Sequence, residues 1–213
     1  MARLLHIHAS PRAWQSYSFR VASAFLEAFQ SRHPGVGVET LNLFTAGIPE
    51  FTAPAAAAKY AVMDGQEPQD EAEQAWEKVV ELIRDFASAD AYVISTPMWN
   101  FSIPYKLKQY VDNLVQPGLT FSYSPTEGYR GMLLNKSALL ILARGGEYPV
   151  GSEAAGMDMQ KPYLETILRF IGVTNIRSLT VESTLSSPDV AERNLQAALA
   201  QAKELGAQWP ALA

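Results

Sequence analysis

Short apolar runs along the chain alternate with longer segments in which hydrophobic residues recur at helical spacing. Runs of four to nine apolar or alternating residues are typical of strands, and they lie at residues 3–9, 36–44, 90–96, 137–143 and 176–182. The segment after the first run places Phe19, Ala22, Phe25 and Phe29 on one face before Pro34 ends the pattern. The chain is therefore expected to alternate strand and helix five times.

The other helices are predicted from the same spacing. The clearest carries Trp76, Val79 and Ile83 on one face and begins with acidic residues, which the dipole of a helix N-terminus favours. Further helices are expected to begin near residues 55, 105 and 187, and one more carries residues 163–170. Residues 45–70 otherwise predict an irregular excursion. Residues 118–133 alternate on both sides of a Pro/Gly turn and predict a hairpin.

Continuous apolar strands that alternate with amphipathic helices indicate a parallel sheet covered by helices on both faces. Five strands suit the flavodoxin-like order 2-1-3-4-5 of an α/β fold. The chain has no internal repeat and no linker, so we expect one domain over residues 1–213.

Composition and charge narrow the possible functions. The chain has no cysteine, which excludes disulfides, thiolate metal sites and thiol nucleophiles. A net charge of −5 without Lys/Arg runs argues against nucleic-acid binding. No apolar run reaches the length of a membrane span, and the one at the start is too short for a signal peptide. A cytoplasmic protein without membrane partners is expected.

Three unusual loops follow the first, third and fourth strands. They read "SPRAWQSYS" at 10–18, "TPMWNFSIP" at 96–104 and "ARGGEYPVG" at 143–151. Ligands of open parallel sheets bind beyond the carboxyl ends of the strands, near the point where the strand order reverses. The fold therefore predicts that these loops converge on one binding site.

The first loop combines hydroxyl groups with a helix N-terminus. Ser10, Ser16 and Ser18 add donors to the free N–H groups of the first helical turn, and Arg12 adds charge. A single serine there could equally cap the helix, but the set favours phosphate binding. The chain lacks both Gly-x-Gly-x-x-Gly and Gly-Lys-Ser/Thr, so a monophosphate is expected rather than a nucleoside triphosphate or a Rossmann-type dinucleotide.

The other two loops suit a flat ligand. Trp99 and Phe101 lie between two prolines that restrict the backbone, although such aromatics could also pack into the core. Adjacent glycines at 145 and 146 allow close approach to main-chain N–H groups, although they could form a plain turn. Together the loops would fit FMN, with its phosphate on the first loop and its ring on the other two.

The chain resembles the FMN-dependent NADH-azoreductases, bacterial flavoproteins of the flavodoxin-like superfamily. The similarity covers nearly the whole chain and is most specific in "PMWNFSIPYKLKQYVDN" with "GLTFSYSPTEG" after it, joined by "SPRAWQSYS" and "ARGGEY". The chain departs from the family at two positions. It has Ala143 where the family often has a hydroxyl residue, and Trp99 where tyrosine is common. The resemblance implies flavin contacts at Ser10, Ser16, Tyr17, Ser18, Met98, Trp99, Asn100, Phe101, Ala143, Arg144, Gly145 and Gly146.

The resemblance also implies an activity. NADH would reduce the flavin and leave, and a quinone or an azo compound would then take the electrons at the same place, a ping-pong mechanism. An azo bond would be cleaved to two amines in two such rounds, in a homodimer whose subunits share the pocket. Because the cofactor carries the chemistry, no catalytic side chain is expected. His6, His8 and His33 match no metal-ligand spacing, so no metal is expected.

Two other classes of function remain at this point. A flavodoxin-type electron carrier would bind FMN without an organic substrate, but such carriers are usually shorter and more acidic and lack the extra segments at 45–70 and 117–131. A hydrolase, such as an acyl-carrier-protein phosphodiesterase, should show a nucleophile with a base or a metal cluster, and the sequence has neither pattern.

Overall fold

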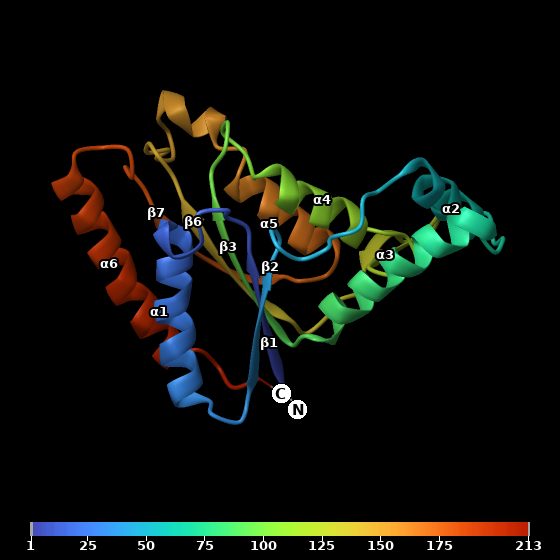
Figure 1. Cartoon of the computed structure of the whole chain (residues 1–213), viewed down its shortest axis with the longest axis horizontal. Coiled ribbons are helices and arrows are strands. Elements are labelled where there is room, and N and C mark those ends of the chain that lie inside the picture. Colours follow the sequence, from blue (N-terminus) through green and yellow to red (C-terminus); the bar gives the residue numbers. More distant parts are fainter. Residues whose placement is uncertain (1, 213) are drawn as a thin grey trace.

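A five-stranded parallel sheet forms the centre of the computed structural model, which describes residues 2–212 (Figure 1). The strand order is β2-β1-β3-β6-β7, and all four pairings are parallel. Strands β4 and β5 form a separate hairpin, so when the sheet strands alone are numbered the order is 2-1-3-4-5. The predicted flavodoxin-like sheet is therefore confirmed. The strands are β1 Arg3–His8, β2 Gly37–Asn42, β3 Ala91–Pro97, β6 Ser137–Ala143 and β7 Asn175–Val181.

Burial explains why the central strands read as continuous apolar runs. Nearly every residue of β1, β3 and β6 is buried, because helices cover both faces of the sheet. The edge strand β2 leaves Glu39 and Thr40 exposed, and no residue of it is fully buried, so its sequence is more polar than those of the central strands.

Two helices cover one face of the sheet and three cover the other (Figure 1). The first pair is α1 Tyr17–Arg32 with α6 Pro188–Ala207, and the second set is α3 Asp70–Ser88, α4 Tyr105–Leu114 and α5 Lys161–Phe170. The first pair packs so closely that a Cβ on Gly206 would lie 2.4 Å from the carbonyl oxygen of Phe25. Only glycine allows that helix contact.

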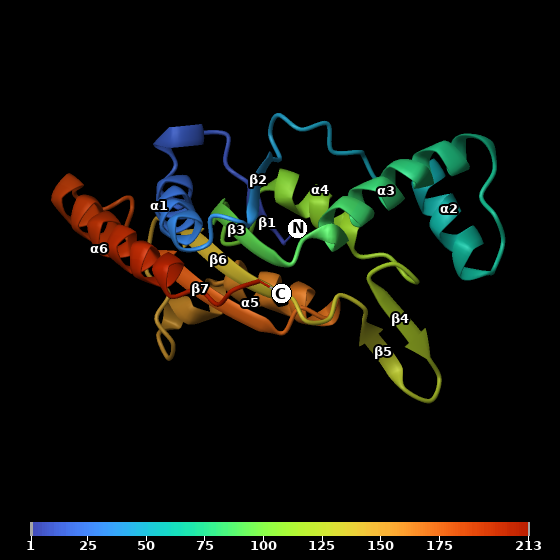
Figure 2. The same cartoon turned by 90° about the horizontal axis from the view of Figure 1, so that it is seen from below.

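Two excursions leave the layered body. The helix α2, Ala53–Met63, packs on α3. It begins two residues before the predicted start, because Pro54 fits the first turn of a helix. The hairpin of β4, Phe121–Ser124, and β5, Gly128–Gly131, projects beyond the sheet (Figure 2).

The hairpin is anchored to α5 and the turn after it. The rings of Phe121 and Phe170 lie 4.8 Å apart, and a Cβ on Gly131 would lie 2.1 Å from the backbone nitrogen of Gly172. The predicted hairpin is therefore present and rests on the body at its base. Two short 3₁₀ segments, Ala13–Gln15 and Glu153–Met157, were not predicted.

None of the helices within residues 2–212 combines the length and the apolar composition needed to cross a membrane.

Candidate functional site

The three predicted loops meet at the carboxyl edge of the sheet, around a cavity of about 200 Å³. The structure thus brings together most of the residues proposed from the sequence, while Ser18, Asn100, Phe101, Arg144 and Gly146 do not line this cavity. The lining residues are Ser10, Arg12, Ser16, Tyr17, Pro97, Met98, Trp99, Ala143, Gly145, Thr184 and Leu185.

The N-terminus of α1 supplies the hydroxyl groups of Ser16 and Ser18. Ser16 precedes the helix but its side chain makes no capping hydrogen bond, so the simple capping alternative does not hold. Its Oγ lies 3.1 Å from the Oγ of Ser18, and both side chains are buried. The N–H groups of the first turn have no partner inside the helix. These donors fit a phosphate group, which carries charge and accepts several hydrogen bonds.

The second loop folds into a two-residue turn. The N–H of Trp99 donates to the Ser102 carbonyl at 2.9 Å, and the N–H of Ser102 donates back at 2.9 Å. Asn100 and Phe101 have φ values of +48° and +69°, as in the mirror-image turns that close hairpins. Trp99 and Phe101 are exposed, which excludes the core-packing alternative.

The third loop presents backbone to the cavity rather than charge. A Cβ on Gly145 would lie 2.7 Å from Cδ1 of Leu185, so a side chain there would displace the cavity wall. Arg144 points away into ion pairs with Asp158 and Glu182. The small cavity therefore fits FMN in its donors and in the glycine that keeps one wall open, whereas the Arg144 side chain is engaged elsewhere.

Sequence reasoning missed one wall of the cavity. Thr184 and Leu185 follow β7, whose carboxyl end lies at the same edge as those of β1, β3 and β6. The hydroxyl of Thr184 donates to the carbonyl of Arg144 at 2.9 Å. The signal for these residues was available, because they directly follow the fifth predicted strand.

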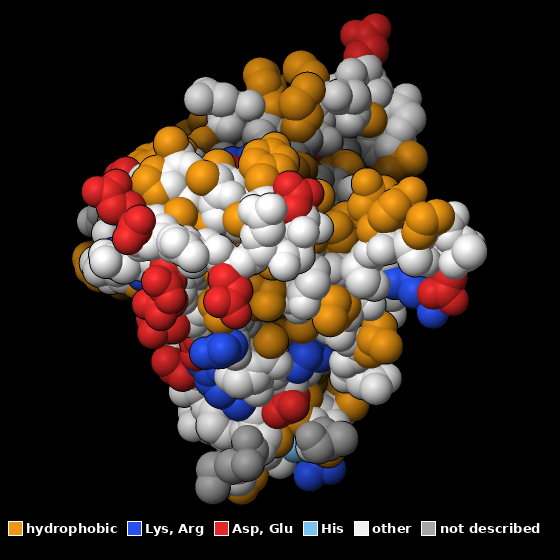
Figure 3. All heavy atoms as spheres, turned by 90° about the vertical axis from the view of Figure 1, so that its right-hand side faces the viewer, with side chains coloured by type: hydrophobic (Ala, Val, Ile, Leu, Met, Phe, Trp, Pro, Cys, Tyr) orange, Lys and Arg blue, Asp and Glu red, His pale blue; other side chains and the backbone are white. Residues whose placement is uncertain are grey.

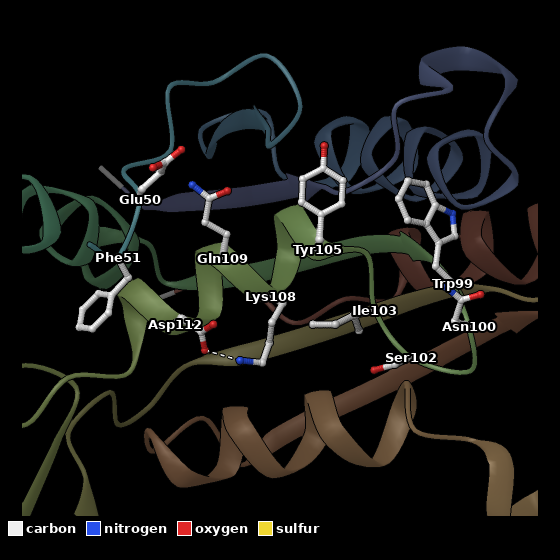
Figure 4. A pocket seen from close by; sticks show the side chains of 10 residues that line it. All are labelled: Glu50, Phe51, Trp99, Asn100, Ser102, Ile103, Tyr105, Lys108, Gln109 and Asp112. Atoms are coloured by element: carbon white, nitrogen blue, oxygen red, sulfur yellow. Dashed lines mark hydrogen bonds and ion pairs between the residues drawn. The ribbon is translucent and has the colours of Figure 1, made fainter. Parts of the chain in front are cut away.

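A larger cavity of about 670 Å³ lies beside the first (Figure 4). Trp99 lines both cavities. Its ring and that of Tyr105 both meet Phe44 edge to face, at centroid distances of 6.0 and 5.9 Å. The arrangement offers aromatic surface to a flat ligand next to the small cavity. The lining residues are Glu50, Phe51, Trp99, Asn100, Ser102, Ile103, Tyr105, Lys108, Gln109 and Asp112.

Figure 4 shows how these side chains are distributed. Trp99 and Asn100 lie at one end of α4, and Glu50 and Phe51 lie at the other. The only ion pair drawn among the lining residues joins Lys108 to Asp112, one helical turn apart. The wall between the two ends is mixed in character, so the aromatic end near Trp99 is the part best suited to a flat apolar molecule.

The histidines of β1 are buried structural groups. Burial lowers the pKa of His6 to about 3 and also lowers the pKa of His8, so both rings are neutral at physiological pH. Their ring nitrogens lie 2.8 and 3.2 Å from the Oγ of Ser95. Across residues 2–212 no three His, Asp or Glu side chains are grouped so that they could hold a metal ion.

Comparisons with known proteins agree with this geometry. A family model described as a flavodoxin-like fold matches residues 2–205. The FMN-dependent NADH:quinone oxidoreductase of Nitratidesulfovibrio vulgaris (strain DP4) is 46% identical, over 98% of this chain and 100% of its own. The FMN-dependent NADH:quinone oxidoreductase 3 of Pseudomonas fluorescens is 40% identical, over 99% of both chains.

Solved structures extend the comparison. An azoreductase from Bacillus anthracis superposes with a TM-score of 0.90 at 30% identity, covering 98% of this chain and 100% of that one. An FMN-dependent NADH-azoreductase from the same species, in complex with FMN, gives a TM-score of 0.87 at 29% identity, with 98% and 99% covered. The chain therefore belongs to the flavodoxin-like family of FMN-dependent NADH:quinone oxidoreductases.

Proposed function

We propose that this protein is an FMN-dependent oxidoreductase that takes electrons from NADH and passes them to quinones and azo compounds. The observation that carries the proposal is the pair of adjacent cavities, one rich in hydroxyl and N–H donors and one lined by aromatic rings, with Trp99 shared between them. The names of the relatives at 40–46% identity support the same reaction class.

Each part of the small cavity has a task in this proposal. Ser16, which lines the cavity, would bind the phosphate of FMN together with the N–H groups that begin α1. Ser18 does not line the cavity and would support this contact through its Oγ, 3.1 Å from that of Ser16. Met98, Trp99 and Gly145 would hold the flat ring. Bound FMN supplies two-electron chemistry, accepting a hydride from NADH and returning electrons to an acceptor. The protein then needs to bind, orient and exclude water rather than provide an acid–base pair.

A single aromatic pocket next to the ring implies an order of events. The nicotinamide ring of NADH and the oxidant are both flat, and both would need the surface near Trp99, so they would occupy it in turn. We infer ping-pong kinetics and, for an azo compound, two rounds of NADH use that release two amines.

Assembly is the second part of the proposal. Exposed aromatic side chains occur on the turn at Phe101, on α4 at Tyr105 and on the hairpin at Tyr123 and Tyr129. Figure 3 shows hydrophobic side chains gathered between charged ones on the side of the molecule that carries α2 and α3. Monomeric proteins rarely expose that much aromatic surface without a partner, which supports a homodimer that shares the pocket. Light scattering at micromolar concentration should give the mass of a dimer, and a monomer that turns over would contradict the shared pocket.

Steady-state and rapid kinetics test the activity. Initial rates measured against NADH at several fixed quinone concentrations should give parallel lines in a reciprocal plot. Mixing the FMN-loaded protein with NADH alone should bleach the flavin absorption at least as fast as turnover. Intersecting lines would indicate a ternary complex and separate sites. A flavin that NADH cannot bleach would remove the proposal and favour the electron-carrier alternative.

A further inference from the structure

A buried polar cluster around Arg144 lies directly behind the small cavity. Its side chain is 4% exposed, and each of three nitrogens reaches a different residue. Nε donates to Oε1 of Gln160 at 3.1 Å, Nη1 to Oε1 of Glu182 at 3.2 Å and Nη2 to Oδ2 of Asp158 at 2.8 Å. The planar guanidinium suits this task, because its donors point in fixed, different directions.

The Glu182 contact joins the glycine loop to the loop after β7. The same carboxylate oxygen of Glu182 accepts the N–H of Tyr148 at 3.3 Å. Next to it, the N–H of Thr184 donates to the Arg144 carbonyl at 3.1 Å and the N–H of Leu185 donates to the Gly145 carbonyl at 3.3 Å. Gly145 and Leu185 both line the cavity and lie against each other here. The ion pair therefore holds two walls of the cavity in one arrangement.

The other two contacts reach the aromatic turn. Asp158 accepts the N–H groups of Gln160 and Lys161 at 3.0 and 3.1 Å, which fixes the start of α5. Met159 lies between Asp158 and Gln160 in the chain, and its N–H donates to the carbonyl of Phe101 at 2.9 Å. The amide of Gln160 also donates to the carbonyl of Thr96, near the end of β3, at 3.4 Å. Arg144 is thus linked to the start of the loop that carries Trp99 and to the turn within it.

We propose that Arg144 is a positioning residue that sets the separation between the Gly145 backbone and the 99–102 turn. Its partners lie behind the glycine loop, the 99–102 turn and the loop after β7, and none lies on α1. Arg144 therefore acts on the ring end of the site and not on the phosphate end. The inference rests on the proposed function, since the ring to be held is that of FMN. Lysine would keep the positive charge but could reach only part of the three acceptors.

The test compares Arg144→Lys with a matched surface change, Arg169→Lys, because the Arg169 side chain is 52% exposed and pairs with Glu165 at 3.0 Å. Apo-protein is titrated with FMN and, separately, with riboflavin, which lacks the phosphate. Arg144→Lys should weaken both ligands by the same factor, roughly tenfold or more. It should also alter the visible circular dichroism of the bound flavin. Arg169→Lys should change neither the affinities nor the spectrum.

Several outcomes would overturn the inference. Unchanged affinities and an unchanged spectrum in Arg144→Lys would exclude a positioning role, and a loss confined to FMN would move the effect to the phosphate end. If Arg144→Lys does not fold, Gln160→Met decides, because it keeps both ion pairs and removes the two hydrogen bonds through which Gln160 joins Arg144 to Thr96. A spectrum identical to wild type would then refute the inference. A wild-type protein that binds neither flavin would instead refute the proposed function, which keeps the two failures distinct.

Discussion

Two arginines at opposite edges of the same sheet make the same kind of contact in different surroundings. Arg3 begins β1 at the amino edge and pairs with Glu39 and Asp85, both at 2.8 Å. Arg144 follows β6 at the carboxyl edge and pairs with two carboxylates as well. The carboxylates around Arg3 are 64% and 51% exposed, whereas those around Arg144 are 10% and 31% exposed.

The difference in exposure decides what each cluster can do. Water and salt screen the exposed pairs, so such contacts typically contribute between zero and about 1 kcal/mol. In the drier cluster, removing one partner leaves charges that solvent cannot stabilise. The amino edge therefore holds the sheet to α3 through adaptable contacts. The carboxyl edge holds the loops of the proposed site through contacts that tolerate little change.

The largest expected effect separates these two arginines by stability. Arg144→Met should lower the free energy of unfolding by about 3–5 kcal/mol, because Asp158 and Glu182 lose their shared cation. Arg3→Met should cost about 1 kcal/mol or less. Urea unfolding of both variants measures the difference. Equal losses would mean that burial does not distinguish the two edges.

The next prediction compares cofactor binding after substitutions at the carboxyl edge and at the amino edge of the sheet. Replacing Ser16 and Ser18 together with alanine should weaken FMN binding, since each hydrogen bond to a charged phosphate contributes roughly 1.5–3 kcal/mol. Riboflavin affinity should not change. The control is Ser88→Ala at the amino edge, whose hydroxyl accepts a hydrogen bond from Arg3 at 2.6 Å. Titration of apo-protein measures both ligands, and an unchanged FMN affinity in the double variant would remove the phosphate assignment.

A third prediction concerns His6, which lies in β1 between the two edges. Burial lowers its pKa to about 3, well below the unfolded value of 6.5. The unfolded chain therefore binds the extra proton first, so stability is complete above pH 6.5 and falls as the pH drops toward 3. The loss is about 1.4 kcal/mol per pH unit once the unfolded histidine is protonated.

Urea unfolding at pH 7 and pH 5 tests this sign. Between these values the wild type should lose about 2 kcal/mol more than a His6→Asn variant, because only the wild type has to keep that ring neutral. A variant that loses as much stability as the wild type over this range would show that His6 does not govern the acid response.

The smallest expected effect is a response to salt. Raising the ionic strength from about 0.05 M to 1 M shortens the screening length to roughly 3 Å. The stability difference between wild type and Arg3→Met should shrink by a few tenths of a kcal/mol, while the difference for Arg144→Met should hold. A salt response of the same size at both arginines would mean that the Arg144 cluster is as hydrated as the exposed one.

Much of the fold was predictable from local pattern. The buried strands around Leu5, Val93 and Leu140 are apolar on both faces, which is typical of a sheet that helices cover on both sides. The hairpin was predictable because alternation flanked a turn. The proposed homodimer and the cytoplasmic location remain predictions from the sequence.

Parts of the site were not predictable, for a different reason. The sequence identifies Ser16, Ser18, Gly145 and Gly146 as candidates, because helix starts and close backbone approach each favour few residue types. Arg144 was expected to contact the cofactor because it lies in the same motif as the glycines. The structure turns its side chain toward Asp158, Gln160 and Glu182, and the expected contact with the cofactor stays a prediction.

The sequence by itself determined the strand and helix periodicity, the sheet order and the three loops that meet at one edge, because hydrophobic spacing and turn chemistry act over a few residues. Only the tertiary structure decided that Thr184 and Leu185 complete the cavity, that Trp99 lines two cavities at once, and that Arg144 lies behind the wall rather than in it. These features depend on contacts between segments far apart in the chain. Burial and the direction of a side chain at such contacts follow from packing, which no local pattern encodes.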